Sequence, residues 1–136
     1  MDYYKFLKAG LDSYEGDFDK FIMYAPDFYS LLCKLTEENI DKEDKTKIYS
    51  ALAYFIIPND TIPEDLYGPA GFIDDIFVSA SVLKGLSTKY GIEFLKKYWD
   101  QDEDLEKVIT LCLDKSKEIL RKKNLLEATI KLASLD

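Results

Sequence analysis

The chain has 136 residues, a size that suits one folded domain, and 47% of them are hydrophobic, enough to form a core. Its net charge of −8 would repel phosphate groups, so we expect no direct binding to DNA, RNA or anionic lipid. It has no histidine, which excludes histidine catalysis and histidine metal ligands, and its 2 cysteines are too few for a cysteine-rich metal site.

Apolar residues recur at helical spacing through nearly the whole chain, so the pattern predicts an all-α fold. The first helical segments are short: one over residues 2–9, and a turn or two that begins at Asp17. Pro26 is expected at the first position of the next helix, where its missing N–H does no harm. That helix carries one apolar face, formed by Phe28, Leu31, Leu32 and Leu35.

Two apolar helices follow, over 42–57 and 74–90, and they are predicted to pair as a central hairpin. Asp41 is expected to cap the first helix, and Pro58 to end it. Residues 51–57 are apolar on all sides, which predicts that these last turns lie in the centre of the core. The side chains expected to be buried together are Leu52, Phe55, Ile56, Ile76, Ala80 and Leu83.

The C-terminal third is predicted to hold a short apolar helix and a longer amphipathic one. Asp100, with Glu103 as its reciprocal partner, is expected to cap the longer helix. Cys112 falls on its apolar stripe, which predicts a buried, unreactive thiol. Asn124 is expected either to cap a last helix or to lie within one unbroken helix.

Together these patterns predict a single all-helical domain over residues 1–136. Its architecture is a compact bundle of five to seven short helices around the central apolar hairpin. No stretch reaches the roughly 18 apolar residues that a membrane span needs, and no signal-peptide pattern is visible. We therefore expect a cytoplasmic protein without a transmembrane segment.

The segment between the two hairpin helices has an unusual distribution of charge. No lysine or arginine occurs between Lys47 and Lys84, whereas the rest of the chain mixes the two signs. The same segment holds five carboxylates, which are Asp60, Glu64, Asp65, Asp74 and Asp75. These acids are predicted to lie at one end of the hairpin beside apolar surface, and they are the candidate binding residues.

The residues around these acids resemble a known family. The pattern Tyr54-x-x-x-Pro58-x-Asp60-x-Ile62-Pro63-Glu64, followed by Gly71-Phe72-Ile73-Asp74-Asp75, is similar to the signature of the YkvA-like proteins. That prokaryotic group has no established activity, and the resemblance spans residues 51–83 only. It implies a helical hairpin core and, for some members, association with a membrane. The run Asp65-Leu66-Tyr67-Gly68-Pro69 departs from the family, which more often has an apolar residue and proline there.

Two interpretations of the five acids stay open. In the structural one, Asp60 accepts hydrogen bonds from loop amides, Asp74 caps the second hairpin helix, and Asp75 and Glu64 favour helix N-termini through the dipole. In the other, Asp60, Asp74 and Asp75 hold Ca²⁺ or Mg²⁺, the ions that prefer oxygen ligands. A metal-dependent hydrolase would also need an open coordination position and a base. No nucleophile motif or phosphate-binding loop is present.

For function, we expect a small acidic helical interaction or regulatory module rather than an enzyme. It would need no cofactor and would bind a protein partner through the acidic end of the hairpin (60–75) or through the flanking helices. One alternative is an acidic mimic of nucleic acid that inhibits a nucleic-acid-binding protein. Others are a carboxylate metal-binding protein with hydrolase-like activity, and a peripheral membrane protein whose hairpin dips into lipid. The oligomeric state has no signature in the sequence.

Overall fold

The structure is a computed structural model that describes residues 4–5, 20–56 and 72–133. Helix makes up 81% of these residues and no strand occurs among them, which confirms the all-α prediction. No helix within the described ranges is long and apolar enough to cross a membrane. The predictions for the turn at Asp17, for Pro58, and for Asp60, Glu64 and Asp65 fall outside the described residues.

The described part of the chain contains one 3₁₀ helix and six α-helices, in line with the predicted five to seven. In chain order they are η1 (Lys20–Tyr24), α2 (Ala25–Leu35), α3 (Lys42–Ile56), α5 (Ile73–Tyr90), α6 (Ile92–Lys96), α7 (Leu105–Lys122) and α8 (Leu126–Leu132). The predicted hairpin helices are α3 and α5, and their bounds differ from the expected ones by a residue at most.

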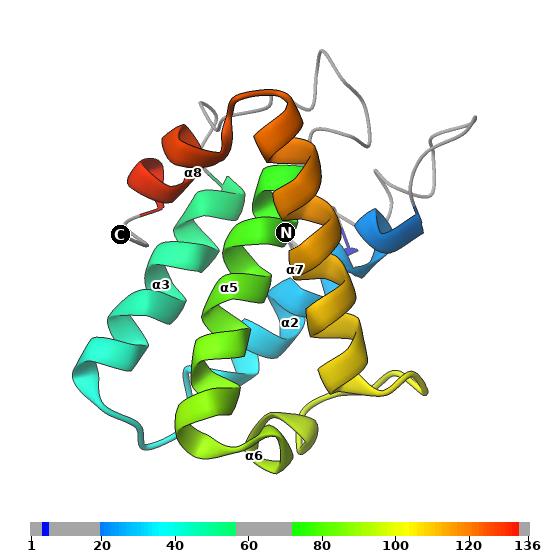
Figure 1. The fold of residues 1–136 in the computed structure, drawn as a ribbon. Coiled ribbons are helices and arrows are strands. Elements are labelled where there is room, and N and C mark those ends of the chain that lie inside the picture. Colours follow the sequence, from blue (N-terminus) through cyan, green and yellow to red (C-terminus); the bar gives the residue numbers. More distant parts are fainter. Residues whose placement is uncertain (1–3, 6–19, 57–71, 134–136) are drawn as a thin grey trace.

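Helix α5 is the central element of the bundle. It contacts every other element named above, with α3 on one side, α7 on the other and α2 behind it (Figure 1). Its first eight residues, 73–80, are all buried. The buried residues of this segment include the polar Asp74, Asp75 and Ser79 as well as apolar ones, because other helices surround it. Farther along, α5 has exposed positions, which include Lys84 and Gly85.

Helix α3 lies at the edge of the bundle, and the prediction that its last turns are central was wrong. Phe55 is 4% exposed, whereas the next residue, Ile56, is 56% exposed. Leu52 is half-buried and Ala53 is exposed. Because α3 packs on α5 and α2 from one side, an all-round apolar sequence still buries one face only. The other members of the predicted buried set, including Ile76, lie in the core.

The start of α7 also corrects a prediction. The N-cap is Asp104, not Asp100, and its carboxylate accepts the backbone N–H of Lys107 at 3.2 Å. Asp100 instead pairs with Lys34 of α2 at 2.7 Å. The residue three positions after Asp104 is Lys107, so Asp104 caps the helix without the acidic partner that the sequence pattern had at Asp100.

Two other helix boundaries were settled by backbone geometry. Asn124 has a φ of 59° and separates α7 from α8, so the alternative of one unbroken helix is wrong. It does not cap α8, whose N-cap is Leu125 without a side-chain bond. Helix α2 begins at Ala25, directly after η1, which places Pro26 one residue later than predicted.

Candidate functional site

The two described acids of the hairpin motif, Asp74 and Asp75, lie inside the protein. Both are 0% exposed and stand in the first turn of α5. Asp74 Oδ2 accepts a hydrogen bond from the hydroxyl of Tyr54 at 3.0 Å, and its Oδ1 accepts the backbone N–H of Asp75 at 3.1 Å. Tyr54 belongs to α3 and is 2% exposed, so the tyrosine and the aspartate of the motif join the two hairpin helices within the core.

Asp74 does not cap α5 in the way the sequence suggested. The N-cap is Phe72, which makes no side-chain capping bond, and Asp74 is the second residue of the helix. A carboxylate in the first turn is still stabilised by the helix dipole and by a backbone amide. The expected cap position of Asp74 was therefore wrong, whereas Asp75, for which the dipole interaction was expected, does stand in the first turn of α5.

The metal interpretation finds no ligand cluster in the part of the chain that the structure describes. There, no group of three or more His, Cys, Asp or Glu residues is placed to hold an ion. Asp74 and Asp75 are neighbours on one helix, and side chains one residue apart diverge by about 100°. Asp60, the third predicted ligand, lies outside the described residues, as do Glu64 and Asp65.

A groove of about 590 Å³ runs along the opposite half of the hairpin, between α3, α5 and α8. We call it the α3–α5 groove. Its volume lies in the range of natural binding pockets. Its apolar lining is Phe77, Val82, Leu86 and Ile130, its small residues are Ser81 and Gly85, and its charged residues are Glu43, Asp44, Lys47 and Lys89.

The small residues of this groove come from consecutive turns of α5. Ser81 and Gly85 are four residues apart and therefore share a face of the helix. Gly85 is exposed, and a glycine inside a helix costs about 1 kcal/mol relative to alanine. Sequence reasoning missed the groove because its residues come from three separate helices. The isolated glycine within an apolar helical pattern was the available signal.

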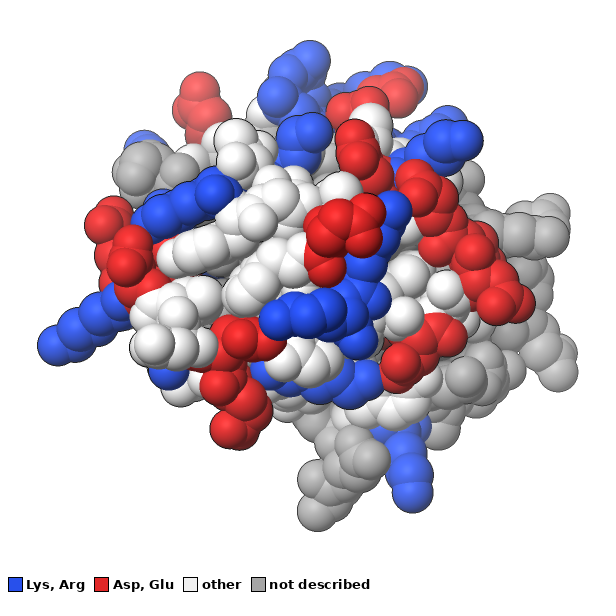
Figure 2. Space-filling model, turned by 90° about the horizontal axis from the view of Figure 1, so that it is seen from below, with Lys and Arg blue, Asp and Glu red and all other residues white. Residues whose placement is uncertain are grey.

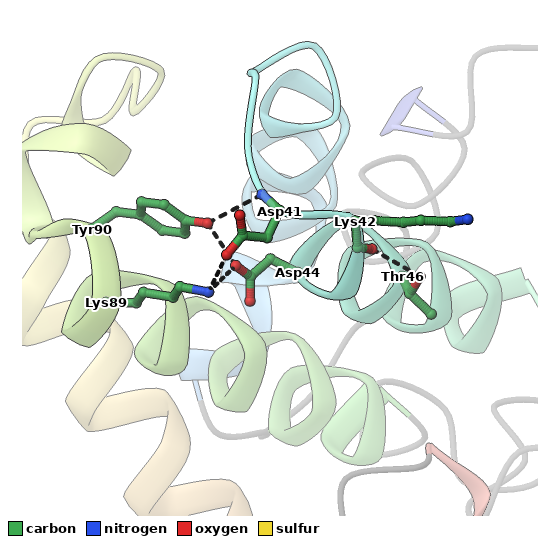
Figure 3. A network of polar contacts seen from close by, with 6 residues as sticks. All are labelled: Asp41, Lys42, Asp44, Thr46, Lys89 and Tyr90. Carbon is green, nitrogen blue, oxygen red and sulfur yellow. Dashed lines mark hydrogen bonds and ion pairs between the residues drawn. The ribbon is translucent and has the colours of Figure 1, made fainter.

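One end of the groove is closed by a polar cluster that joins the start of α3 to the end of α5 (Figure 3). Lys89 Nζ lies 2.7 Å from Oδ2 of both Asp41 and Asp44. The hydroxyl of Tyr90 donates to Asp44 at 2.6 Å and accepts the backbone N–H of Asp41 at 3.3 Å. These hydrogen bonds, that of Lys89 first, lower the pKa of the Asp44 carboxyl below its ordinary value.

A second lysine–tyrosine pair repeats this arrangement eight residues farther along the chain. Lys97 Nζ pairs with Glu38 at 2.8 Å, and the Tyr98 hydroxyl donates to the same carboxylate. Glu38 and Asp41 both belong to the connection between α2 and α3. The two pairs therefore hold the α2–α3 connection against the region where α5 and α6 meet. Their role is structural, and they lie at the end of the bundle where α3 begins and α5 ends.

The surface at this end of the bundle carries both signs of charge. Seen from below, Lys or Arg side chains and Asp or Glu side chains surround an uncharged area (Figure 2). A mimic of nucleic acid needs a continuous row of negative charge, because the phosphates of DNA repeat at a close spacing. On one side of the face in Figure 2 several acidic side chains adjoin one another, whereas elsewhere on that face blue and red side chains are mixed.

Comparison with known proteins places the hairpin in a family without an assigned role. Residues 44–80 match the model of a protein family of unknown function, DUF1232. That segment includes Tyr54, Asp74 and Asp75, and it ends before Gly85. No solved structure matches the chain.

A relative covers most of the chain. The uncharacterized protein ORF9 of Methanothermobacter thermautotrophicus is 31% identical over 123 residues, which are 89% of this chain and 84% of that protein. The likeness thus extends well beyond the hairpin into the helices that complete the bundle. The chain belongs to the same family as ORF9, and its segment that matches DUF1232 includes most of α3 and the first half of α5.

Proposed function

We propose that this protein is a non-enzymatic interaction module that binds an amphipathic helix of a protein partner in the α3–α5 groove. The observation that carries the proposal is the groove itself, which is open, has an apolar floor and is bordered by charges of both signs. Helix-in-groove recognition uses this combination: apolar side chains of the partner fill the floor while its polar face meets the rim.

The way α8 packs supports a helix as the occupant. Helix α8 contacts α5, and its Ile130 contributes to the lining of the groove, so this face already accepts one short helix of the chain itself. Ser81 and Gly85 lie beyond it on the same face and would let another helix approach closely. A partner helix would therefore continue along α5 where α8 ends.

The charges on the rim favour a partner of mixed sign. Glu43 and Lys47 are exposed, stand four residues apart on α3, and form no ion pair with another described residue. A complementary helix would carry a basic residue opposite Glu43 and an acidic one opposite Lys47, one turn apart. Complementary charge of this kind contributes to the choice and orientation of a partner.

The hairpin motif has a different role in this proposal. Asp74 is buried and accepts a hydrogen bond from Tyr54 of α3, so it holds α5 against α3, the two helices that form walls of the groove. We also propose that the protein is cytoplasmic. We further propose that its hairpin is that of the YkvA-like proteins, whose signature its motif resembles. The apolar residues that line the groove are the reason to prefer a helix-binding module to a nucleic-acid mimic.

Site-specific photocrosslinking tests the proposed function. A benzophenone amino acid replaces Ser81 in the groove and, as a matched control, Thr110 on the exposed face of α7. We expect the Ser81 probe to capture, in lysate of the source organism, a segment with apolar residues at i, i+3 or i+4, and i+7. The Thr110 probe should not capture that segment.

The captured segment is then made as a synthetic peptide and titrated against purified variants. Ser81→Arg places a large charged side chain in the groove and should weaken binding at least tenfold, whereas Thr110→Arg should leave it unchanged. Capture of the same segments from both positions would refute the proposed function, as would equal affinity of both arginine variants.

A further inference from the structure

We infer that α3 pairs in antiparallel orientation with α3 of a second copy of this chain. The contact surface, which we call the α3 seam, consists of the exposed residues Thr46, Tyr49, Ala53 and Ile56, with Lys42 at its N-terminal end. Tyr49 and Ile56 are 55% and 56% exposed, although both are large apolar side chains. The seam lies on a different side of α3 from the α3–α5 groove, so the inference does not depend on the proposed function.

The spacing of the α3 seam is that of a coiled coil. From Lys42 to Ile56 the steps along the chain are four, three, four and three residues, as between the two core positions of a heptad repeat. Residues at this spacing stay on one side of a helix and pack against a second helix. Ile48 and Phe55, on the opposite side of α3, are buried in the chain's own core. Only the fold shows that the seam faces outward, because the last turns of α3 are apolar on both sides.

The sizes of the side chains along the α3 seam favour the antiparallel orientation. Small and large residues alternate, with Thr46 and Ala53 small and Tyr49 and Ile56 large. In an antiparallel pair, Tyr49 faces Ala53 of the second copy and Ile56 faces Thr46 of the second copy, so each large side chain meets a small one. In a parallel pair identical residues would meet, which leaves gaps between the small ones. The Thr46 hydroxyl donates to the backbone carbonyl of Lys42 at 2.9 Å, so its polar atom is already satisfied within the helix (Figure 3).

The charges along α3 favour the same orientation. Lys42 stands in the first turn in line with the seam, whereas the last turn of α3 has no basic residue. The C-terminus of a helix carries the negative end of its dipole, and the next charged residue in the sequence after α3 is Asp60. Antiparallel pairing places Lys42 of each copy beside this negative end of the other copy, whereas parallel pairing would set lysine against lysine. A two-fold axis satisfies both ends equally, and it is the commonest symmetry of homodimers.

Sedimentation velocity of the full chain measures this association. The seam covers two heptads, so the interface is small, and we expect a weak dimer that forms as the concentration rises from about 1 μM to about 1 mM. The sedimenting mass should rise from 15.7 kDa toward twice that value. Ile56→Glu and Ala53→Glu should each stay monomeric and keep their helical circular dichroism, because both residues are exposed. The matched control is Leu111→Glu on α7, where the leucine is 45% exposed, and it should dimerise as the unaltered protein does.

Disulfide trapping tests the orientation. In a Cys33→Ser background, a Thr46→Cys protein and a tagged Ile56→Cys protein are mixed and oxidised. Antiparallel pairing brings these two positions together and leaves identical positions about 15 Å apart along the axis, beyond the reach of a disulfide. The mixed disulfide should therefore exceed either disulfide between identical chains at least about tenfold. An excess of disulfides between identical chains would overturn the inference, as would a protein that stays monomeric up to about 1 mM or equal dimerisation of Ile56→Glu and Leu111→Glu.

Discussion

Tyr54 and Asp74 form a contact between the two hairpin helices at a place that water does not reach. The tyrosine hydroxyl donates to a carboxylate that is 0% exposed. Loss of a donor to a buried acceptor costs about 1–3 kcal/mol, and more when the acceptor is charged. We therefore expect Tyr54→Phe to reduce the free energy of unfolding by at least about 1 kcal/mol in urea titrations. The control is Tyr49→Phe on the same helix, where the ring is 55% exposed and the cost should stay below about 0.5 kcal/mol. Equal costs would show that the buried contact contributes nothing.

Asp44 should give the stability of the protein a recognisable dependence on pH. Its hydrogen bonds from Lys89 and Tyr90 lower the pKa of the folded carboxyl below the value it has in the unfolded chain. The resulting stabilisation is present above the unfolded pKa and is lost as pH falls through the folded pKa. We expect Asp44→Asn to be less stable than the unaltered protein at pH 7, with a difference that shrinks between about pH 5 and pH 2.

The control for this pH dependence is Asp41→Asn, which alters an exposed partner of the same lysine. The side chain of Asp41 is 69% exposed, so its ion pair is worth about 0–1 kcal/mol at any pH. Urea titrations at a series of pH values measure both variants. A difference between Asp44→Asn and the unaltered protein that stays constant with pH would contradict the prediction.

At the scale of the element, α3 offers a direct comparison of its two faces. Phe55 packs edge-on against Tyr29 of α2, with ring centroids 5.4 Å apart, whereas its neighbour Ile56 points away from the bundle. Phe55→Ala should cost about 3–5 kcal/mol, because it leaves a cavity in the core. Ile56→Ala should cost less than about 1 kcal/mol, since the side chain is already 56% exposed. Denaturant titrations of the two variants measure the loss in the free energy of unfolding. Similar losses would contradict the conclusion that α3 buries only one of its faces.

At the scale of the whole molecule, Cys112 reports how rarely the bundle opens. It is 0% exposed in α7, and burial raises the pKa of its thiol to about 12. In a Cys33→Ser background, we expect an aromatic disulfide reagent to label Cys112 at least about a thousandfold more slowly than a free thiol. Urea should accelerate the labelling in step with unfolding. The control moves the thiol by one residue, through Leu111→Cys with Cys112→Ser, because Leu111 is 45% exposed. Rapid labelling of Cys112 in the folded protein would contradict the packing of α7 on α5.

The sequence by itself determined the helical class, the pairing of α3 with α5 and the burial of residues such as Phe28 and Cys112. These features follow from local physics, because helical periodicity acts within a few residues of the chain. The prominent acids of the motif were also visible, but their burial was not. A carboxylate in a sequence is normally exposed, and only the packing of α3 and neighbouring elements around α5 encloses Asp74 and Asp75.

Tertiary structure decided everything that depends on which helix covers which face. In the tertiary structure Ile56 lies outside the core, and Asp104 caps α7 where the sequence predicted Asp100. Helices α3, α5 and α8 together line the groove that contains Gly85. The physical reason is common to all three. An apolar or capping residue has several acceptable environments, and the choice among them depends on contacts with segments far away in the chain.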